Sequence, residues 1–266
     1  MLQQDTSRQD QPDPNRNAEI EQRVKQANRV LYDAVADNYE EVDGRRSPEL
    51  EAWLRATLED LKGRVGGGRL LDLGTGSGLV PRCATGLFTT RVGVDISPLI
   101  LALNRDVFDV AAAADVDHLP FPDNCFDVIT CFAALHHLPA FELLSQEVAR
   151  VLAPGGIFYS EHDMDESFYR RFRFPLGIYR RLHDARAAYE KASGKITGEL
   201  YDDAEWHQKG VPSRHIVGLL EGAGLHPEVT HHWYGLNPLT DRLFAHRTYG
   251  AGWAPLLAIR AVKRAA

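Results

Sequence analysis

Titratable side chains follow two apolar runs of the sequence, where they could accept a proton from a bound molecule. His162 and Asp163 follow the run 157–160, and His136 follows the run 126–132. A histidine or carboxylate held near a substrate hydroxyl is a common general base. We therefore interpret His162 with Asp163 as the preferred candidate for a catalytic base. His136 is a second candidate, or it could instead form the wall of a ligand pocket.

A glycine-rich turn indicates a second kind of chemistry, in which backbone amides hold a ligand. Residues 70–78 read LLDLGTGSG, and a short helix is expected over 79–88. The alternating glycines let the chain bend sharply and lie against a ligand without a Cβ in the way. A strand, a glycine turn and a helix in this order are the opening of a nucleotide-binding βαβ unit. A tight strand-to-helix turn that binds no ligand would have the same sequence pattern.

Carboxylates at the ends of neighbouring apolar runs strengthen the ligand interpretation. Asp95 ends the run 90–94 and stands 21 residues after Gly74. A separation of about 20 is expected for a carboxylate that accepts from ribose hydroxyls. Asp115 ends the next run, 111–114. Because parallel strands end at one edge of a sheet, these carboxylates and Asp72 are expected to meet there.

These segments together resemble class I S-adenosylmethionine-dependent methyltransferases, in particular the type 11 group. The matching segments are LLDLGTGSG (70–78), VGVDIS (92–97), ADVDHLPFPDNCFDVI (114–129), ALHHLP (134–139) and VARVLAPGG (148–156). The resemblance implies that S-adenosylmethionine is the cofactor. It implies that Asp95 binds the ribose and that Asp115 binds the adenine amino group, with the backbone of Val116. The cofactor site that the resemblance implies also includes Asp72, Gly74, Thr75, Gly76, Gly78, Ile96, Phe132 and His137.

The segment before the glycine turn looks like the helix that folds over the cofactor in this family. Tyr32 and Tyr39 lie seven residues apart on one helical face, so either could touch the ligand. They could equally pack this helix on the sheet.

The expected fold is α/β: a Rossmann-like, seven-stranded, mostly parallel sheet with helices on both faces. We expect a disordered leader over 1–17 and one domain over 18–265, with N-terminal helices over 18–62. A helical lid insertion is expected over 164–212. Further helices are predicted over 48–62, 99–108, 141–152 and 213–221, the last with Ser213 as its N-cap, and the last two strands over 225–234 and 256–262. On the first of those strands, one of His231 and His232 should point inward and the other outward.

Composition limits the classes of partner. The net charge of −7 argues against a general nucleic-acid binder. The three cysteines show no metal spacing and suggest a reducing compartment. No apolar run is long enough to span a membrane, so a cytoplasmic location is the default. No metal is expected, because His162, Asp163 and His207 show no recognisable ligand spacing.

The insertion is basic, unlike the rest of the chain. Residues 168–195 hold eight basic and two acidic side chains, a formal charge of +6, interleaved with aromatic and aliphatic residues. This segment could be a helical lid whose arginines pair with acidic neighbours. It could also hold an anionic acceptor, or dock on an anionic membrane to reach a lipid-linked one.

The sequence therefore predicts methyl transfer to a small molecule, with O-methylation favoured over N- or C-methylation. One alternative keeps S-adenosylmethionine but uses the site for another reaction or for regulation. A second is an NAD-type oxidoreductase, which is disfavoured because its glycine motif would need glycine where Leu79 stands.

Overall fold

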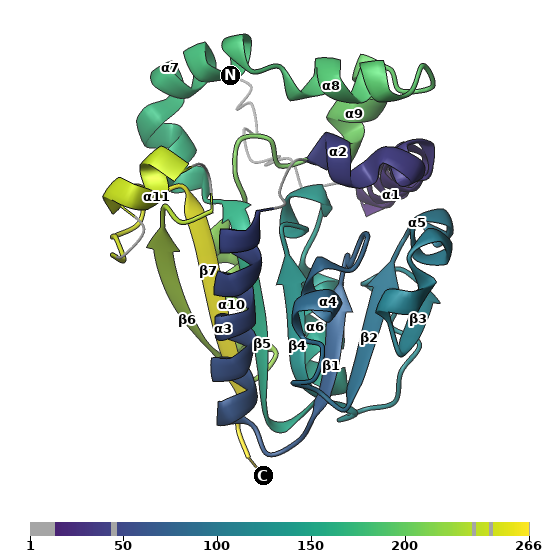
Figure 1. The fold of residues 1–266 in the computed structure, drawn as a ribbon, viewed down its shortest axis with the longest axis vertical. Helices are drawn as coiled ribbons and strands as arrows, with labels where there is room; N and C mark the ends of the chain where they lie inside the picture. Colours follow the sequence, from purple (N-terminus) through teal and green to yellow (C-terminus); the bar gives the residue numbers. More distant parts are fainter. Residues whose placement is uncertain (1–13, 44–46, 236–237, 245–246, 266) are drawn as a thin grey trace, which may run out of the picture.

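A central sheet organises the computed structural model, which describes residues 14–43, 47–235, 238–244 and 247–265 (Figure 1). Seven strands of this described part lie in the order β3-β2-β1-β4-β5-β7-β6. Neighbours among β1 to β5 pair in parallel, whereas β7 is antiparallel to both β5 and β6. The predicted Rossmann-like sheet is therefore confirmed. The strands are β1 Arg69–Leu73, β2 Thr90–Asp95, β3 Val110–Ala113, β4 Phe126–Phe132, β5 Leu152–Met164, β6 Leu225–His232 and β7 Leu256–Lys263.

Helices cover both faces of the sheet because neighbouring strand residues point to opposite sides. Leu70 and Val128 pack with α3 and α4, whereas Leu71 and Ile129 pack with α6 and α10. The helices are α1 Pro14–Val35, α2 Tyr39–Asp43, α3 Pro48–Arg64, α4 Leu79–Cys83, α5 Pro98–Leu103, α6 Glu142–Val151, α7 Glu166–Leu182, α8 Ala185–Ala192, α9 Gly198–Ala204, α10 Ser213–Gly222 and α11 Pro238–Phe244. Short 3₁₀ turns are η1 Ala36–Asn38, η2 Arg105–Val107 and η3 Leu135–His137. None of the described helices is long and apolar enough to cross a membrane.

Two groups of helices lie above the carboxyl edge of the sheet. Figure 1 shows α1 and α2 on one side of this edge and α7, α8 and α9 above it. Leu31 and Val35 of α1 share an apolar cluster with Tyr189 of α8 and Tyr201 of α9. Helix α1 and the helices α8 and α9 therefore pack on each other above the edge where the strands end.

Several predicted boundaries differ from the structure. Helix α1 begins at Pro14, within the segment expected to be a disordered leader, and residues 1–13 lie outside the described part. Helix α4 ends at Cys83 instead of residue 88, because Gly86 takes a left-handed turn at φ 78°. Strand β5 is much longer than its predicted apolar centre. The prediction of a Ser213 cap is wrong: Pro212 is the N-cap, and the Ser213 side chain hydrogen-bonds Asp165.

The central strand generates a stability prediction. Ile129 is fully buried on β4, so Ile129→Ala should lower the free energy of unfolding by about 2–5 kcal/mol. Val110 lies half exposed on the edge strand β3, and Val110→Ala should change it by only about 0.5 kcal/mol. Urea unfolding of both variants measures the difference, and equal losses would contradict the core described above.

Candidate functional site

A pocket opens at the carboxyl edge of β1, β2 and β4, beneath α1. Among the residues expected to hold a cofactor, all except Gly78 line this pocket. Those that line it are Tyr32, Tyr39, Asp72, Gly74, Thr75, Gly76, Asp95, Ile96, Asp115, Val116, Phe132 and His137. The candidate base His136 also lines it, whereas His162 and Asp163 do not. The topology thus brings residues from distant parts of the chain to one cavity.

The turn after β1 is shaped by two glycines in left-handed conformations. Gly74 has φ 63° and Gly76 has φ 51°. A Cβ on Gly74 would lie 2.7 Å from the Cβ of Ala134, and one on Gly76 would lie 3.0 Å from the Tyr39 hydroxyl. Both positions therefore require glycine for backbone shape and for space.

Asp72 is held at the end of β1 by two threonines. Its carboxylate accepts hydrogen bonds from the hydroxyls of Thr75 and Thr130, each at 2.7 Å. Complete burial raises the pKa of Asp72 to about 7, and the two hydroxyls oppose this rise. The group is thus poised between its neutral and charged forms beside the glycine turn.

Gly78 has a packing role in addition to the cofactor contact that the sequence predicts. It precedes α4 with φ 82°, and a Cβ there would lie 2.6 Å from Val107 and 3.0 Å from the Phe108 ring. Its lack of a side chain allows α4 to pack on the segment before β3. Gly78 itself is not among the residues that line the pocket, whereas Leu79 and Val80 after it are, so its contact with the cofactor stays a prediction.

Asp95 joins the loops that follow β1 and β2. One carboxylate oxygen accepts from the Gly76 N–H at 2.8 Å, and the other accepts from the Ser97 N–H at 2.9 Å. Burial raises the pKa of Asp95, and these amides act against the rise. The carboxylate lines the pocket in an orientation fixed by the backbone.

Asp115 forms an ion pair that sequence reasoning missed. Lys25 of α1 lies 2.7 Å from Asp115 and 2.6 Å from Asp117, and it lines the pocket with Asn28 and Tyr32. Positions 25, 28 and 32 share one helical face, so their polar side chains at helical spacing were the available signal. The lysine closes the end of the pocket where Asp115 stands.

His137 forms a neutral wall between α1 and α9. Its Nε2 lies 2.8 Å from the Tyr32 hydroxyl, and its Nδ1 lies 3.0 Å from the carbonyl oxygen of Ala204. A neutral ring satisfies both contacts when Nδ1–H donates to the carbonyl and Nε2 accepts from the hydroxyl. Burial lowers the pKa of His137 to about 4, which favours this neutral form.

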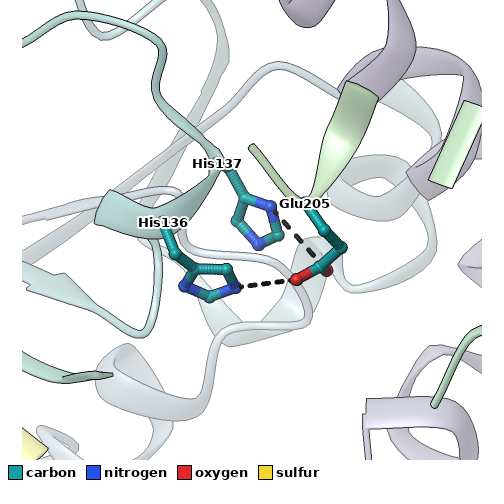
Figure 2. Close-up of side chains that lie close together, drawn as sticks. All are labelled: His136, His137 and Glu205. Atoms are coloured by element: carbon teal, nitrogen blue, oxygen red, sulfur yellow. Dashed lines mark ion pairs between the residues drawn. The ribbon is translucent and has the colours of Figure 1, made fainter. Parts of the chain in front are cut away.

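His136 is held by a buried carboxylate on one side and faces a second carboxylate on the other. Its Nδ1 lies 2.6 Å from Asp163, which also accepts from the backbone N–H of His136 at 3.0 Å. Burial favours protonated Asp163, but the bonds from His136 hold its pKa below the usual value. Figure 2 shows Nε2 directed at Glu205, which follows α9, at 3.5 Å.

The structure separates the two residues that were expected to form the base. His162 has φ 69°, and its buried ring stacks on Phe132 with centroids 4.4 Å apart and packs beside Trp53. Asp163 instead holds His136. Because the His162 ring stacks on Phe132 while Asp163 binds His136, the two side chains do not form one pair toward the pocket. Of the two histidines predicted as bases, His136 lines the cavity and His162 does not.

Two histidine–carboxylate groups among the described residues could hold a metal ion by geometry: His136, His137 and Glu205, and Glu161, His162 and His232. Both groups differ from the combination of His162, Asp163 and His207 that the sequence analysis considered. Both nitrogens of His137 already have protein partners, which weakens the first group as a metal site.

His231 and His232 are both buried, so the prediction that one points outward is wrong. They do lie on opposite faces of β6, but each faces a buried carboxylate. His231 Nε2 lies 3.3 Å from Asp165, and His232 Nε2 lies 2.7 Å from Glu161. Both faces of the strand are covered at this point.

Comparison with known proteins agrees with this geometry. Residues 71–160 match the family model described as a methyltransferase domain. The chain carries a class I S-adenosylmethionine-dependent methyltransferase domain. S-adenosylmethionine is the cofactor of this domain, and the glycine cradle and the pocket carboxylates fit it.

Curated relatives of this methyltransferase domain align over part of the chain. A demethylmenaquinone methyltransferase of Symbiobacterium thermophilum is 30% identical over 164 residues, covering 57% of this chain and 64% of the relative. A 27-O-demethylrifamycin SV methyltransferase of Amycolatopsis mediterranei is 34% identical over 146 residues, covering 47% and 54%. The chain thus spans less than two thirds of the length of these relatives.

A solved methyltransferase shares the fold over most of the chain. The S-adenosylmethionine-dependent methyltransferase of Thermotoga maritima superposes with a TM-score of 0.58 at 15% identity, covering 89% of this chain and 99% of that one. This likeness extends the fold assignment beyond residues 71–160.

The hydrogen bonds of Asp95 lead us to expect that its substitution weakens cofactor binding. Asp95→Asn removes the charge that orders Gly76 and Ser97, so the affinity for S-adenosylhomocysteine should fall by about tenfold or more. Asp109→Asn, at the opposite end of the sheet, should leave it unchanged. Titration calorimetry measures both, with NAD as the comparison ligand. Undiminished affinity in Asp95→Asn would refute the ribose assignment, and NAD binding without S-adenosylhomocysteine binding would refute the cofactor.

The buried His137 ring predicts a pH effect. Its pKa of about 4 lies below the value of about 6.5 in an unfolded chain. Acidification through this interval should destabilise the fold, because the unfolded chain then binds a proton that the folded ring does not. A ¹H–¹⁵N titration should show an imidazole signal with a midpoint near pH 4 that is absent in His137→Gln. A midpoint of about 6.5 would contradict the buried neutral wall.

Proposed function

We propose that the protein transfers the methyl group of S-adenosylmethionine to an oxygen of a small-molecule acceptor. The observation that carries this proposal is the position of His136, which lines the same pocket as the glycine turn and is hydrogen-bonded to buried Asp163. When bound, the cofactor supplies an activated methyl group. The protein then has to bring the acceptor into line with it and exclude water.

His136 is the residue we propose as the general base. If its Nδ1–H donates to Asp163, Nε2 is the nitrogen that takes the hydroxyl proton of the acceptor. The imidazolium formed lies between the carboxylates of Asp163 and Glu205, which stabilise its charge. Asp163 is then a positioning residue, because it fixes the tautomer and direction of His136 without lining the pocket. The relative named as a 27-O-demethylrifamycin SV methyltransferase supports transfer to oxygen, whereas other relatives are named as C-methyltransferases.

The bound methyl donor is proposed to lie between α1 and the strand ends, with the insertion over 164–212 covering the acceptor. The pocket residues Glu205 and Tyr189 come from this insertion, which supports its role in acceptor binding. An anionic or lipid-linked acceptor remains part of the proposal, and it rests on the charge of +6 over 168–195. None of these basic side chains is among the residues lining the pocket, which favours a role at the surface over one in the acceptor cavity.

A search for the acceptor tests the proposed activity. Soluble and lipid extracts incubated with the protein and methyl-labelled S-adenosylmethionine should yield a labelled product whose methyl group is on oxygen. Label on carbon or nitrogen would refute O-methylation. Tight cofactor binding with no labelled product would favour the alternative in which the site binds S-adenosylmethionine for another reaction or for regulation.

Substitution of His136 tests its role once the acceptor is known. His136→Gln should lower kcat by about 100- to 10,000-fold while leaving S-adenosylhomocysteine affinity nearly unchanged. His162→Ala should affect stability more than turnover, because its ring is packed outside the pocket. His215→Gln, on the surface, is the control. Full turnover in His136→Gln would show that the base lies elsewhere or that none is needed.

A further inference from the structure

Helix α7 presents a row of apolar side chains that the described part of the protein does not cover. Phe174, Ile178 and Leu182 are 74%, 63% and 74% exposed. They recur every four residues and therefore share one face of the helix, which we call the α7 stripe. Such large apolar groups are rarely left together on a surface without a partner.

The helix that carries the stripe is anchored to the body of the protein at its start. The chain kinks at Phe172, and Pro175 falls in the first turn after the kink, where its missing N–H costs little. Phe168 is buried before the kink and packs on Trp233, whose ring in turn packs on Phe244 of α11. Figure 1 shows α7 and α11 side by side at one end of the molecule. The body of the protein therefore fixes the start of α7, from which the stripe extends.

Arginines surround the stripe. Helix α7 carries Arg170, Arg171, Arg173, Arg180 and Arg181 against a single acid, Glu166. The Arg173 guanidinium lies 4.9 Å from the Phe174 ring, and that of Arg171 lies 4.1 Å from the ring of Trp253, which is 55% exposed. Because the chain as a whole has a charge of −7, this basic face is a local feature. Exposed aromatic and aliphatic residues among arginines are typical of helices that lie in the interface of an anionic bilayer.

We propose that α7 binds the surface of a membrane rich in anionic lipid, with the α7 stripe inserted between headgroups and its arginines paired with lipid phosphates. Guanidinium groups suit phosphate oxygens, and the apolar stripe needs a medium that removes it from water. The biological role of this membrane binding rests on the proposed function. The segment that covers the pocket would face the bilayer that holds a lipid-linked acceptor. The binding itself requires no turnover.

Vesicle flotation of the full chain tests the proposal. The protein should float with vesicles of phosphatidylcholine and phosphatidylglycerol in equal parts. Its affinity for vesicles of phosphatidylcholine alone should be lower by at least about tenfold. Raising the salt from about 0.1 M to about 0.5 M should weaken the binding, because it screens the arginines. Failure to bind the anionic vesicles would overturn the proposal.

Substitutions locate the surface. The triple variant Phe174→Ser, Ile178→Ser, Leu182→Ser should lose at least about tenfold in vesicle affinity. Leu103→Ser, on α5 and 51% exposed, is the matched control and should bind like the original chain. Unchanged vesicle binding by the triple variant would contradict the role of the stripe. If light scattering shows a dimer that the triple variant loses, and vesicles are not bound, the stripe is covered by a second copy and the proposal is wrong.

S-adenosylhomocysteine affinity separates this proposal from the proposed function. All variants should retain the affinity of the original chain, because none of these residues lines the pocket. Retained cofactor affinity without vesicle binding refutes only the membrane surface. Vesicle binding without cofactor binding refutes only the proposed methyl transfer.

Discussion

The arrangement of the site depends on the hydrogen bonds that the Asp95 carboxylate accepts. This carboxylate ties the loop after β1 to the loop after β2 through the N–H groups of Gly76 and Ser97. The group is 7% exposed, so these amides replace the water that a charged carboxylate would otherwise keep. The same loops carry the glycine cradle and lie beneath α1. Without these hydrogen bonds, the turn that we propose as the site of the methyl donor would lose its fixed shape.

A second constraint links the cofactor pocket to the insertion. The two neighbouring histidines after β4 contact different elements. His137 contacts Tyr32 of α1 and the Ala204 carbonyl of α9. His136 contacts Asp163 of β5 and faces Glu205, which follows α9. One pair of neighbouring residues therefore joins the N-terminal helix, the sheet and the insertion at a single point. This placement fixes the position of the proposed base relative to the helices that cover the pocket.

Much of the fold could be predicted because its signals are local. The alternating glycines after 70–73, the carboxylate at Asp95 and the apolar runs identify neighbouring parallel strands, whose ends must meet at one edge. The pair of Asp163 with His136 could not be predicted in this way, because the direction of each side chain depends on the long, bulged strand β5. The position of His162 outside the pocket, stacked on Phe132, could not be predicted for the same reason. Lys25 was missed because its partners, Asp115 and Asp117, lie some ninety residues along the chain.

A crystal structure of the complex with S-adenosylhomocysteine tests the central claim most directly. The account predicts that the ribose hydroxyls donate to the Asp95 carboxylate, that the homocysteine portion lies along Gly74 and Gly76, and that His136 Nε2 faces the sulfur end of the ligand. An adenosyl group bound away from Asp95, or a sulfur atom turned away from His136, would contradict it.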